Sequence, residues 1–164
     1  MSVVDEYTRE CLAIEVAPSV GGSDVVQLLK WLALTCSIPA YIRSDNGPEF
    51  IAKQVRKWIR QADCETIFIT PVNTWENPYI ESFIGKLRDE CLNCEIFVDL
   101  QEAQTVIEAW REEYNTYRPH SSLGYLTPQE FAGQCTEGDP DVRGCMGVGK
   151  SVGTRLTVQV AVEQ

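Results

Sequence analysis

Two acidic residues, Asp45 and Glu81, have positions at which carboxylates can do chemistry. Asp45 ends a predicted short strand in an Asp-Asn-Gly turn, and Glu81 falls in the first turns of a predicted helix. In open α/β sheets, sites form at the carboxyl ends of the strands. Paired carboxylates with no histidine or cysteine partner suit hard cations such as Mg²⁺ or Mn²⁺, which activate a water or a 3′-hydroxyl in phosphodiester chemistry. The competing interpretation is that Asp45 is an ordinary turn residue and Glu81 a solvated helix residue. The spacing of two acidic residues alone is weak evidence for a site.

Alternating strands and helices are predicted around these carboxylates. Apolar runs between turn residues predict strands at residues 3–4, 11–16, 40–43, 65–69 and 154–162. Apolar residues at helical spacing predict helices at residues 24–36, 48–62, 76–92, 100–117 and 128–132. This alternation favours an α/β domain with a largely parallel sheet.

Two of the predicted helices carry an apolar stripe that must face a core. In the helix that contains Glu81 the stripe consists of Ile80, Phe83, Ile84, Leu87 and Cys91. In the next helix the apolar residues are at positions 100, 103, 107, 110, 114 and 117, a regular spacing that predicts one buried seam.

The chain has 164 residues, 44 % of them apolar and 23 % charged, which is typical of one soluble globular domain. Its net charge of −10 argues against nucleic-acid binding over the whole surface, because phosphate contacts need local positive charge. A local basic strip is nevertheless present. Four cations recur at helical spacing opposite the apolar stripe of helix 48–62: Lys53, Arg56, Lys57 and Arg60. A solvated helix face is an equally good interpretation of this strip.

The cysteines and the first residues predict a compartment. Seven cysteines at irregular spacing, and no signal sequence at the start, predict free thiols in the cytoplasm. Cys91 and Cys94 form a C-x-x-C pair, but a zinc site needs four ligands and the only histidine is His120. We therefore predict no zinc site, and thiols that pack as small apolar side chains. No apolar run is long enough to span a membrane.

Five segments of the sequence resemble the integrase-like transposases of bacterial insertion sequences. Segment 42–50 (IRSDNGPEF) resembles the family's second-aspartate motif, and segment 75–83 (WENPYIESF) resembles its catalytic-glutamate motif, which 85–93 (GKLRDECLN) continues. Segment 114–128 (YNTYRPHSSLGYLTP) is similar to the family's C-terminal signature, and segment 3–12 (VVDEYTRECL) to its second and third strand region. The resemblance covers about residues 2–132.

The resemblance implies a ribonuclease-H-like three-layer α/β fold, and metal-dependent DNA cleavage and strand transfer by an Asp-Asp-Glu triad. Asp45 and Glu81 would be the second and third members of that triad and would hold Mg²⁺ or Mn²⁺. The expected partners are DNA, both transposon ends and target, and further copies of the chain in a homo-oligomer. Neither a membrane nor a small-molecule substrate is expected. Seven residues are expected to contact DNA: Asn46, Lys53, Arg56, Lys57, Arg60, Lys86 and Arg88. Arg118 and His120 are expected at the rim of the site.

The family's first aspartate lies on a strand that precedes segment 3–12, so the sheet is expected to lack its first central strand. Asp5 is not expected to substitute, because it falls in a turn and only one strand and one helix separate it from the strand before Asp45. Residues 1–132 are interpreted as a partial catalytic core, and residues 133–164 as a tail outside the family, with a Gly-rich linker and a strand at 154–162. Pairing of this strand with an orphaned sheet edge is a further hypothesis, although its one-sided alternation is typical of a half-exposed strand.

The function predicted from the sequence is DNA transposition or integration, in a truncated and catalytically impaired copy. With one of three carboxylates lost, metal affinity and positioning both suffer. Pro78, Ile84 and the loop at 71–74 also depart from the family pattern, and the loop loses a lysine next to the site. Two alternatives stay open: a non-catalytic DNA-binding or self-associating remnant, and an unrelated α/β binding protein.

Overall fold

The computed structural model describes residues 1–36, 38–44, 47–68, 78–138 and 157–161. Its strands are β1 (Ser2–Asp5), β2 (Cys11–Ile14), β3 (Tyr41–Ser44), β4 (Glu65–Phe68) and β5 (Thr157–Ala161). Its α-helices are α1 (Gly22–Thr35), α2 (Pro48–Ile51), α3 (Lys53–Gln61), α4 (Pro78–Leu87), α5 (Leu100–Thr116) and α6 (Pro128–Gly138). A π-helical turn, η2 (Arg88–Leu92), continues α4, and a 3₁₀ turn, η3 (Ser121–Leu123), precedes α6.

The strands form one mixed sheet in the order β2-β1-β5-β3-β4. β3 is parallel to β4 and β5, whereas β1 is antiparallel to β2 and β5. The prediction of a largely parallel sheet is therefore wrong for the β1–β2 half. The physical reason is that residues 6–10 alone connect β1 to β2, and so short a connection closes a hairpin, whereas a parallel pair needs a long crossover.

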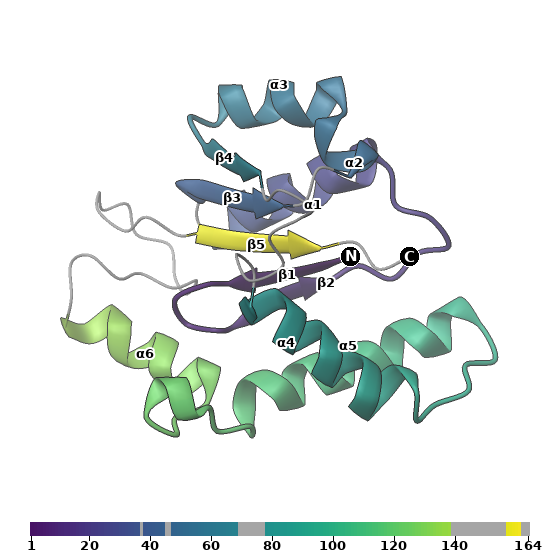
Figure 1. Ribbon diagram of the computed structural model, residues 1–164, viewed down its shortest axis with the longest axis vertical. Coiled ribbons are helices and arrows are strands. Elements are labelled where there is room, and N and C mark those ends of the chain that lie inside the picture. Colours follow the sequence, from purple (N-terminus) through teal and green to yellow (C-terminus); the bar gives the residue numbers. More distant parts are fainter. Residues whose placement is uncertain (37, 45–46, 69–77, 139–156, 162–164) are drawn as a thin grey trace.

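β5 lies at the centre of the sheet although it is the last strand in chain order (Figure 1). Val3 pairs with Val160 on one side, and Ile42 pairs with Val158 on the other. Val158 and Val160 are each 1 % exposed. Both edges of β5 are therefore paired, and it is an interior strand and not a half-exposed one. The sheet was expected to lack its first central strand, and β5, which comes from the tail, occupies the position between β1 and β3.

Helices cover both faces of the sheet and make three layers (Figure 1). One core joins the sheet to α1, α2 and α3, with Val25, Leu29, Phe50 and Val55 among its buried residues. The second core joins the sheet to α4 and α5. Its buried residues are Val4, Cys11, Ile80, Phe83, Leu87, Cys91, Ile107, Trp110 and Tyr114. The apolar stripes predicted for α4 and α5 thus face one another and the sheet, while the two ends of the α5 seam, Leu100 and Tyr117, are exposed.

The helix predicted at 48–62 is broken at Ala52, which has an extended conformation with φ −55° and ψ 137°. The break allows α2 and α3 to turn around the start of α1. There a Cβ atom added to Gly22 would lie 2.6 Å from the Cβ of Ala52. Glycine at position 22 is therefore required by the close approach of these segments.

Five of the described cysteines form no disulfide: Cys11, Cys64, Cys91, Cys94 and Cys135. Cys36, which caps the C-terminus of α1, is disulfide-bonded, so the prediction of a free thiol is wrong there. The spacing of cysteines along a chain does not reveal which of them the fold brings together. Across the described ranges, no helix is both long and apolar enough to cross a membrane.

Candidate functional site

Glu81 lies in the first turn of α4 and its side chain is exposed. The residues beside it, Ile80 and Phe83, are each 1 % exposed. The Phe83 ring meets the rings of Trp110 and Tyr114 edge to face, with centroids 5.5 and 4.9 Å apart. These contacts fix the rotation of α4 on α5 and so direct Glu81 away from the core. A carboxylate held in this way is available to a ligand.

Asp45 and Asn46 lie outside the described residues. The described part of their segment ends at Ser44, which is buried at the carboxyl end of β3 and pairs with Val160 of β5. In the described ranges, no three His, Cys, Asp or Glu side chains lie close enough together to hold a metal ion. Pairing of Asp45 with Glu81 therefore stays a prediction.

Asp5 ends β1 and is buried in the turn that leads to β2. Its carboxylate accepts hydrogen bonds from the backbone N–H of Tyr7 at 3.1 Å and from the hydroxyl of Thr8 at 2.7 Å. Burial raises the pKa of this carboxyl, and its hydrogen bonds with Thr8 and Tyr7 oppose that shift. Asp5 therefore acts as the acceptor that shapes the hairpin turn.

The same turn places Arg9 against the start of α4. Arg9 has φ +63°, a left-handed conformation that is strained for a residue other than glycine. Its guanidinium lies over the ring of Tyr79, 3.3 Å from the centroid, and donates to the carbonyl oxygen of Glu6. Tyr79 is two residues before Glu81 in α4. The β1–β2 turn thus contacts the helical turn that carries Glu81, a role for Arg9 that no spacing in the sequence predicts.

Hydrogen bonds from Asn115, which lies in segment 114–128, and from Arg111 join α5 to the edge strand β2. The Asn115 side chain accepts from the backbone N–H of Cys11 and donates to the Cys11 carbonyl, both at 2.9 Å. Arg111 donates to the same carbonyl at 2.9 Å. These bonds satisfy backbone groups of β2, which among the described strands has a neighbour only on its β1 side.

Replacing Asn115 with Ala is expected to lower the free energy of unfolding by about 2 kcal/mol, because the buried N–H of Cys11 loses its partner. Urea denaturation of the variant measures this change. The neighbouring exposed residue provides the control: Thr116→Ala is expected to change stability by less than about 0.5 kcal/mol. Equal stabilities for the two variants would contradict the role given to Asn115.

Several charges and one imidazole gather where α4, η2 and the end of α5 meet. Arg118 forms an ion pair with Glu90, at 2.6 Å between Nη1 and Oε1, and Trp110 donates to the same carboxylate at 3.3 Å. The hydrogen bond from Arg118 is the main reason why the pKa of Glu90 is lowered. His120 packs edge-on against Tyr114, with ring centroids 5.0 Å apart. Burial, assisted by Lys86, Arg118 and Arg9, lowers the pKa of His120 to about 4, so the imidazole is neutral at pH 7.

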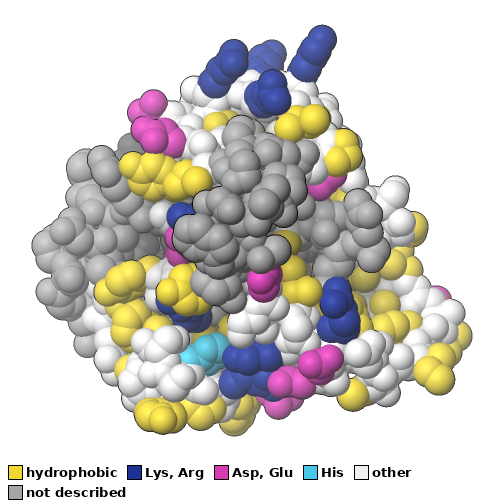
Figure 2. Space-filling view, in the orientation of Figure 1, with side chains coloured by type: hydrophobic (Ala, Val, Ile, Leu, Met, Phe, Trp, Pro, Cys, Tyr) yellow, Lys and Arg dark blue, Asp and Glu magenta, His cyan; other side chains and the backbone are white. Residues whose placement is uncertain are grey.

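The basic strip lies on α3, where Val55 and Ile59 face the core and the four cations are exposed. Figure 2 shows Lys and Arg side chains along the α3 end of the molecule, while other Lys and Arg side chains flank the histidine at the opposite end. The structure therefore separates the predicted DNA-contacting residues into two groups. Lys86, which is half-buried in α4, and the exposed Arg88, at the start of η2, belong to the α4 side with Glu81.

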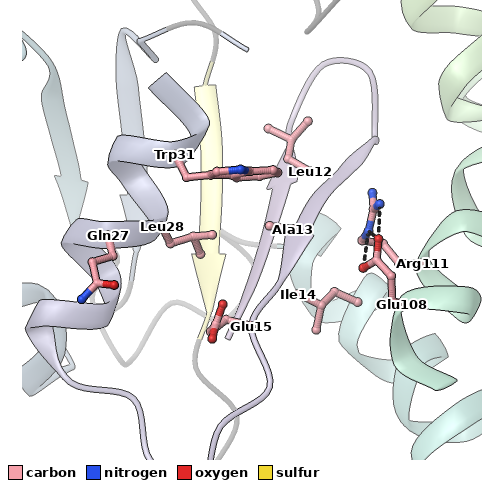
Figure 3. A pocket seen from close by; sticks show the side chains of 9 residues that line it. All are labelled: Leu12, Ala13, Ile14, Glu15, Gln27, Leu28, Trp31, Glu108 and Arg111. Atoms are coloured by element: carbon pink, nitrogen blue, oxygen red, sulfur yellow. Dashed lines mark hydrogen bonds and ion pairs between the residues drawn. The ribbon is translucent and has the colours of Figure 1, made fainter. Parts of the chain in front are cut away.

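An open groove of about 460 Å³ runs along the β2 edge between α1 and α5 (Figure 3). Leu28 and Trp31 of α1 line one side, Ala13 of β2 lines the floor, and the Glu108–Arg111 pair of α5 lines the other side. Trp31 is half-exposed there. Among the described residues, neither Glu81 nor the cations predicted to contact DNA line this groove.

The three-layer arrangement around the sheet β2-β1-β5-β3-β4 is a ribonuclease-H-like fold. The chain is similar to the solved catalytic core domain of BIV integrase, with a TM-score of 0.64 at 18 % identity, over 81 % of this chain and 84 % of that one. This likeness confirms the three-layer fold expected from the sequence motifs.

Sequence comparison identifies the family. A model described as Integrase core domain matches residues 1–74, and a second model with the same description matches residues 62–128. An uncharacterized 39.2 kDa protein of insertion element IS476 from Xanthomonas euvesicatoria is 46 % identical over 132 residues, covering 80 % of this chain and 38 % of that protein. An uncharacterized 31.7 kDa protein of insertion element IS407 from Burkholderia multivorans is 42 % identical over 132 residues, covering 80 % of this chain and 48 % of that protein. The chain therefore belongs to the integrase core domain family found in insertion-element transposases. It spans less than half the length of these two curated relatives.

Proposed function

We propose that this chain carries the DNA-cleaving and DNA-joining core of an insertion-element transposase, in a catalytically impaired copy. The observation that supports the proposal most is the exposed carboxylate of Glu81 on a tightly packed helix in a chain of this family. In this proposal residues 1–132 form the partial core, and the tail from residue 133 contributes β5 to its sheet.

The proposed chemistry needs a divalent cation, Mg²⁺ or Mn²⁺. Carboxylate oxygens are suitable ligands for either ion, and Glu81 is positioned to provide one. Asp45 and Glu81 would hold the cation, which when bound activates a water or 3′-hydroxyl and stabilises the leaving oxygen. If Asp45 and Glu81 alone hold the ion, it is bound less firmly than by three carboxylates, and this is the physical basis of the proposed impairment.

DNA is the proposed partner, as transposon ends and as target. The cations of α3, together with Lys86 and Arg88, would contact phosphates, and such contacts position DNA without reading its sequence. Asn46 is proposed to contact DNA beside Asp45. A homo-oligomer and a cytoplasmic location are parts of the same proposal and stay predictions.

Nicking of supercoiled plasmid in Mn²⁺ tests the proposal. We expect slow nicking by the full chain, reduced by about 100-fold or to background in Glu81→Gln and in Asp45→Asn, because each change removes a cation ligand. Glu112→Gln, which alters an exposed glutamate on α5, is the matched control and is expected to nick at the unchanged rate.

DNA binding, measured by fluorescence anisotropy in the same buffer, separates the alternatives. Binding without any nicking would favour the non-catalytic DNA-binding remnant. Nicking that persists in Glu81→Gln would contradict the proposed site. A folded chain that neither binds nor nicks DNA would favour an unrelated binding function.

A further inference from the structure

His120 is buried in a way that stability does not explain. The residue is 9 % exposed, and its backbone N–H and carbonyl are both bonded within the turn 120–126. The ring nitrogen Nε2 is nevertheless buried with no hydrogen-bond partner among the residues that the structure describes. Leaving a buried polar atom unpaired costs about 1–3 kcal/mol. An unpaired donor or acceptor that persists at such a cost indicates a position that a ligand can satisfy.

Three cations from separate segments influence this imidazole. Arg9 comes from the β1–β2 turn, Lys86 from α4 and Arg118 from the segment after α5, and all three act electrostatically on His120. Within the described ranges, Arg118 is the only one of the three that is bonded to a carboxylate, that of Glu90. The Nε atom of Arg9 is buried and, like Nε2 of His120, has no hydrogen-bond partner in the described part of the chain. A protein of net charge −10 therefore concentrates positive charge at this point.

Two of the cations, Arg9 and Arg118, are held in place before any ligand arrives. The turn shaped by Asp5 fixes Arg9 in its strained conformation, and the Tyr79 ring supports the guanidinium plane. The Arg118 guanidinium is fixed by Glu90 and lies 5.8 Å from the Trp110 centroid and 5.9 Å from that of Tyr114. Side chains that are already ordered lose less entropy on binding, which favours affinity for a small anion.

We propose that Arg9, Lys86, Arg118 and His120 form a binding site for one backbone phosphate of DNA, beside Glu81. The proposal rests on DNA being the substrate, as proposed above. Guanidinium forks match the geometry of phosphate oxygens, and an ammonium adds a point charge. Tyr79, 44 % exposed, connects Arg9 to the helical turn of Glu81. A phosphate bound at this cluster would therefore hold the DNA strand next to the helical turn that carries Glu81.

The single histidine of the chain makes the site directly observable. NMR of the full chain with ¹³C-labelled histidine gives one imidazole signal, which is followed during titration with a short DNA duplex and, separately, with inorganic phosphate. We expect a saturable shift of the signal with the duplex. We also expect a higher pKa of His120 in the complex, because the phosphate charge offsets the three cations.

Substitution of Arg9 tests the contribution of the cluster to affinity. Arg9→Gln is expected to weaken duplex binding about 10-fold, since it removes a charged hydrogen bond to phosphate. Arg9→Lys keeps the charge without the fork and is expected to bind with intermediate affinity. Lys30→Gln makes the same charge change as Arg9→Gln on the exposed side of α1 and is expected to change affinity less than about 2-fold. A thermal melt of each variant shows whether it is folded.

The outcomes separate this proposal from the proposed function. A saturable shift of the His120 signal in a chain that does not nick DNA supports the phosphate site without the catalytic function. A duplex that binds while the signal stays unmoved and both Arg9 variants bind normally overturns the phosphate site and leaves DNA binding intact. A shift produced by inorganic phosphate but not by the duplex also overturns the assignment to DNA.

Discussion

Val160→Asp is expected to abolish cooperative unfolding of this protein or to lower its free energy of unfolding by at least about 4 kcal/mol. Val160 is 1 % exposed at the centre of the sheet, where it packs with the core of α1 and α3. A carboxylate there is either desolvated or forced to bind a proton, and both are costly. Loss of β5 would also unpair the facing backbone groups of β1 and β3. Because the free energy of unfolding of a domain is only about 5–15 kcal/mol, the loss from this single change is comparable with the whole of it.

A thermal melt followed by far-UV circular dichroism measures the effect. Val98→Asp makes the identical chemical change at a residue that is 87 % exposed, and it is expected to alter stability by less than about 0.5 kcal/mol. If Val160→Asp melts like the unchanged chain, β5 does not belong to the folded sheet in solution.

Phe83→Ala is expected to cost about 3–5 kcal/mol, the range for truncation of a buried phenylalanine. The ring is 1 % exposed and makes edge-to-face contacts with Trp110 and Tyr114, so its loss leaves a cavity between α4 and α5. Urea denaturation gives the stability, and near-ultraviolet circular dichroism reports the packing of the two remaining aromatic rings.

The exposed neighbour of Phe83 provides the control for this change. Ser82→Ala alters the same helix on its solvent side and is expected to leave both measurements almost unchanged. An equally small effect of Phe83→Ala would show that α4 is not held by this aromatic contact. The orientation of Glu81 would then need another explanation.

Much of the fold could be predicted from local patterns. The stripe containing Phe83 in α4 and the seam containing Trp110 in α5 repeat at helical spacing, and a helix with one apolar face must bury that face. The break at Ala52 could not be predicted, because alanine is a good helix former and the break depends on the approach of Gly22 from another helix. Tertiary contacts, and not local propensity, decide such boundaries.

The candidate sites also differ in how far the sequence could predict them. Glu81 could be placed in a first helical turn from its motif alone, and the structure has it there, exposed. The sequence motifs predicted Lys86, Arg118 and His120 near the site, but Arg9 could not be predicted there, since it comes from the β1–β2 turn and shares no spacing with the other three. The sequence allowed the hypothesis that β5 pairs with a sheet edge, but its central position could not be derived. Pairing between distant strands leaves no periodic pattern in the sequence of either strand.

The position of β5 has a consequence for how the chain is made. Synthesis proceeds at about 5–20 residues per second, so roughly 4 to 20 seconds separate the appearance of β4 from that of β5. During that interval β1 and β3 each present an open edge, and such edges pair readily with other chains. The sheet is complete only after β5 has been synthesised. The contacts of β5 with the distant strands β1 and β3 therefore form last and slowly. Yield of folded protein should therefore depend more on temperature and on chaperones that shield strand edges than the small size of the domain would suggest.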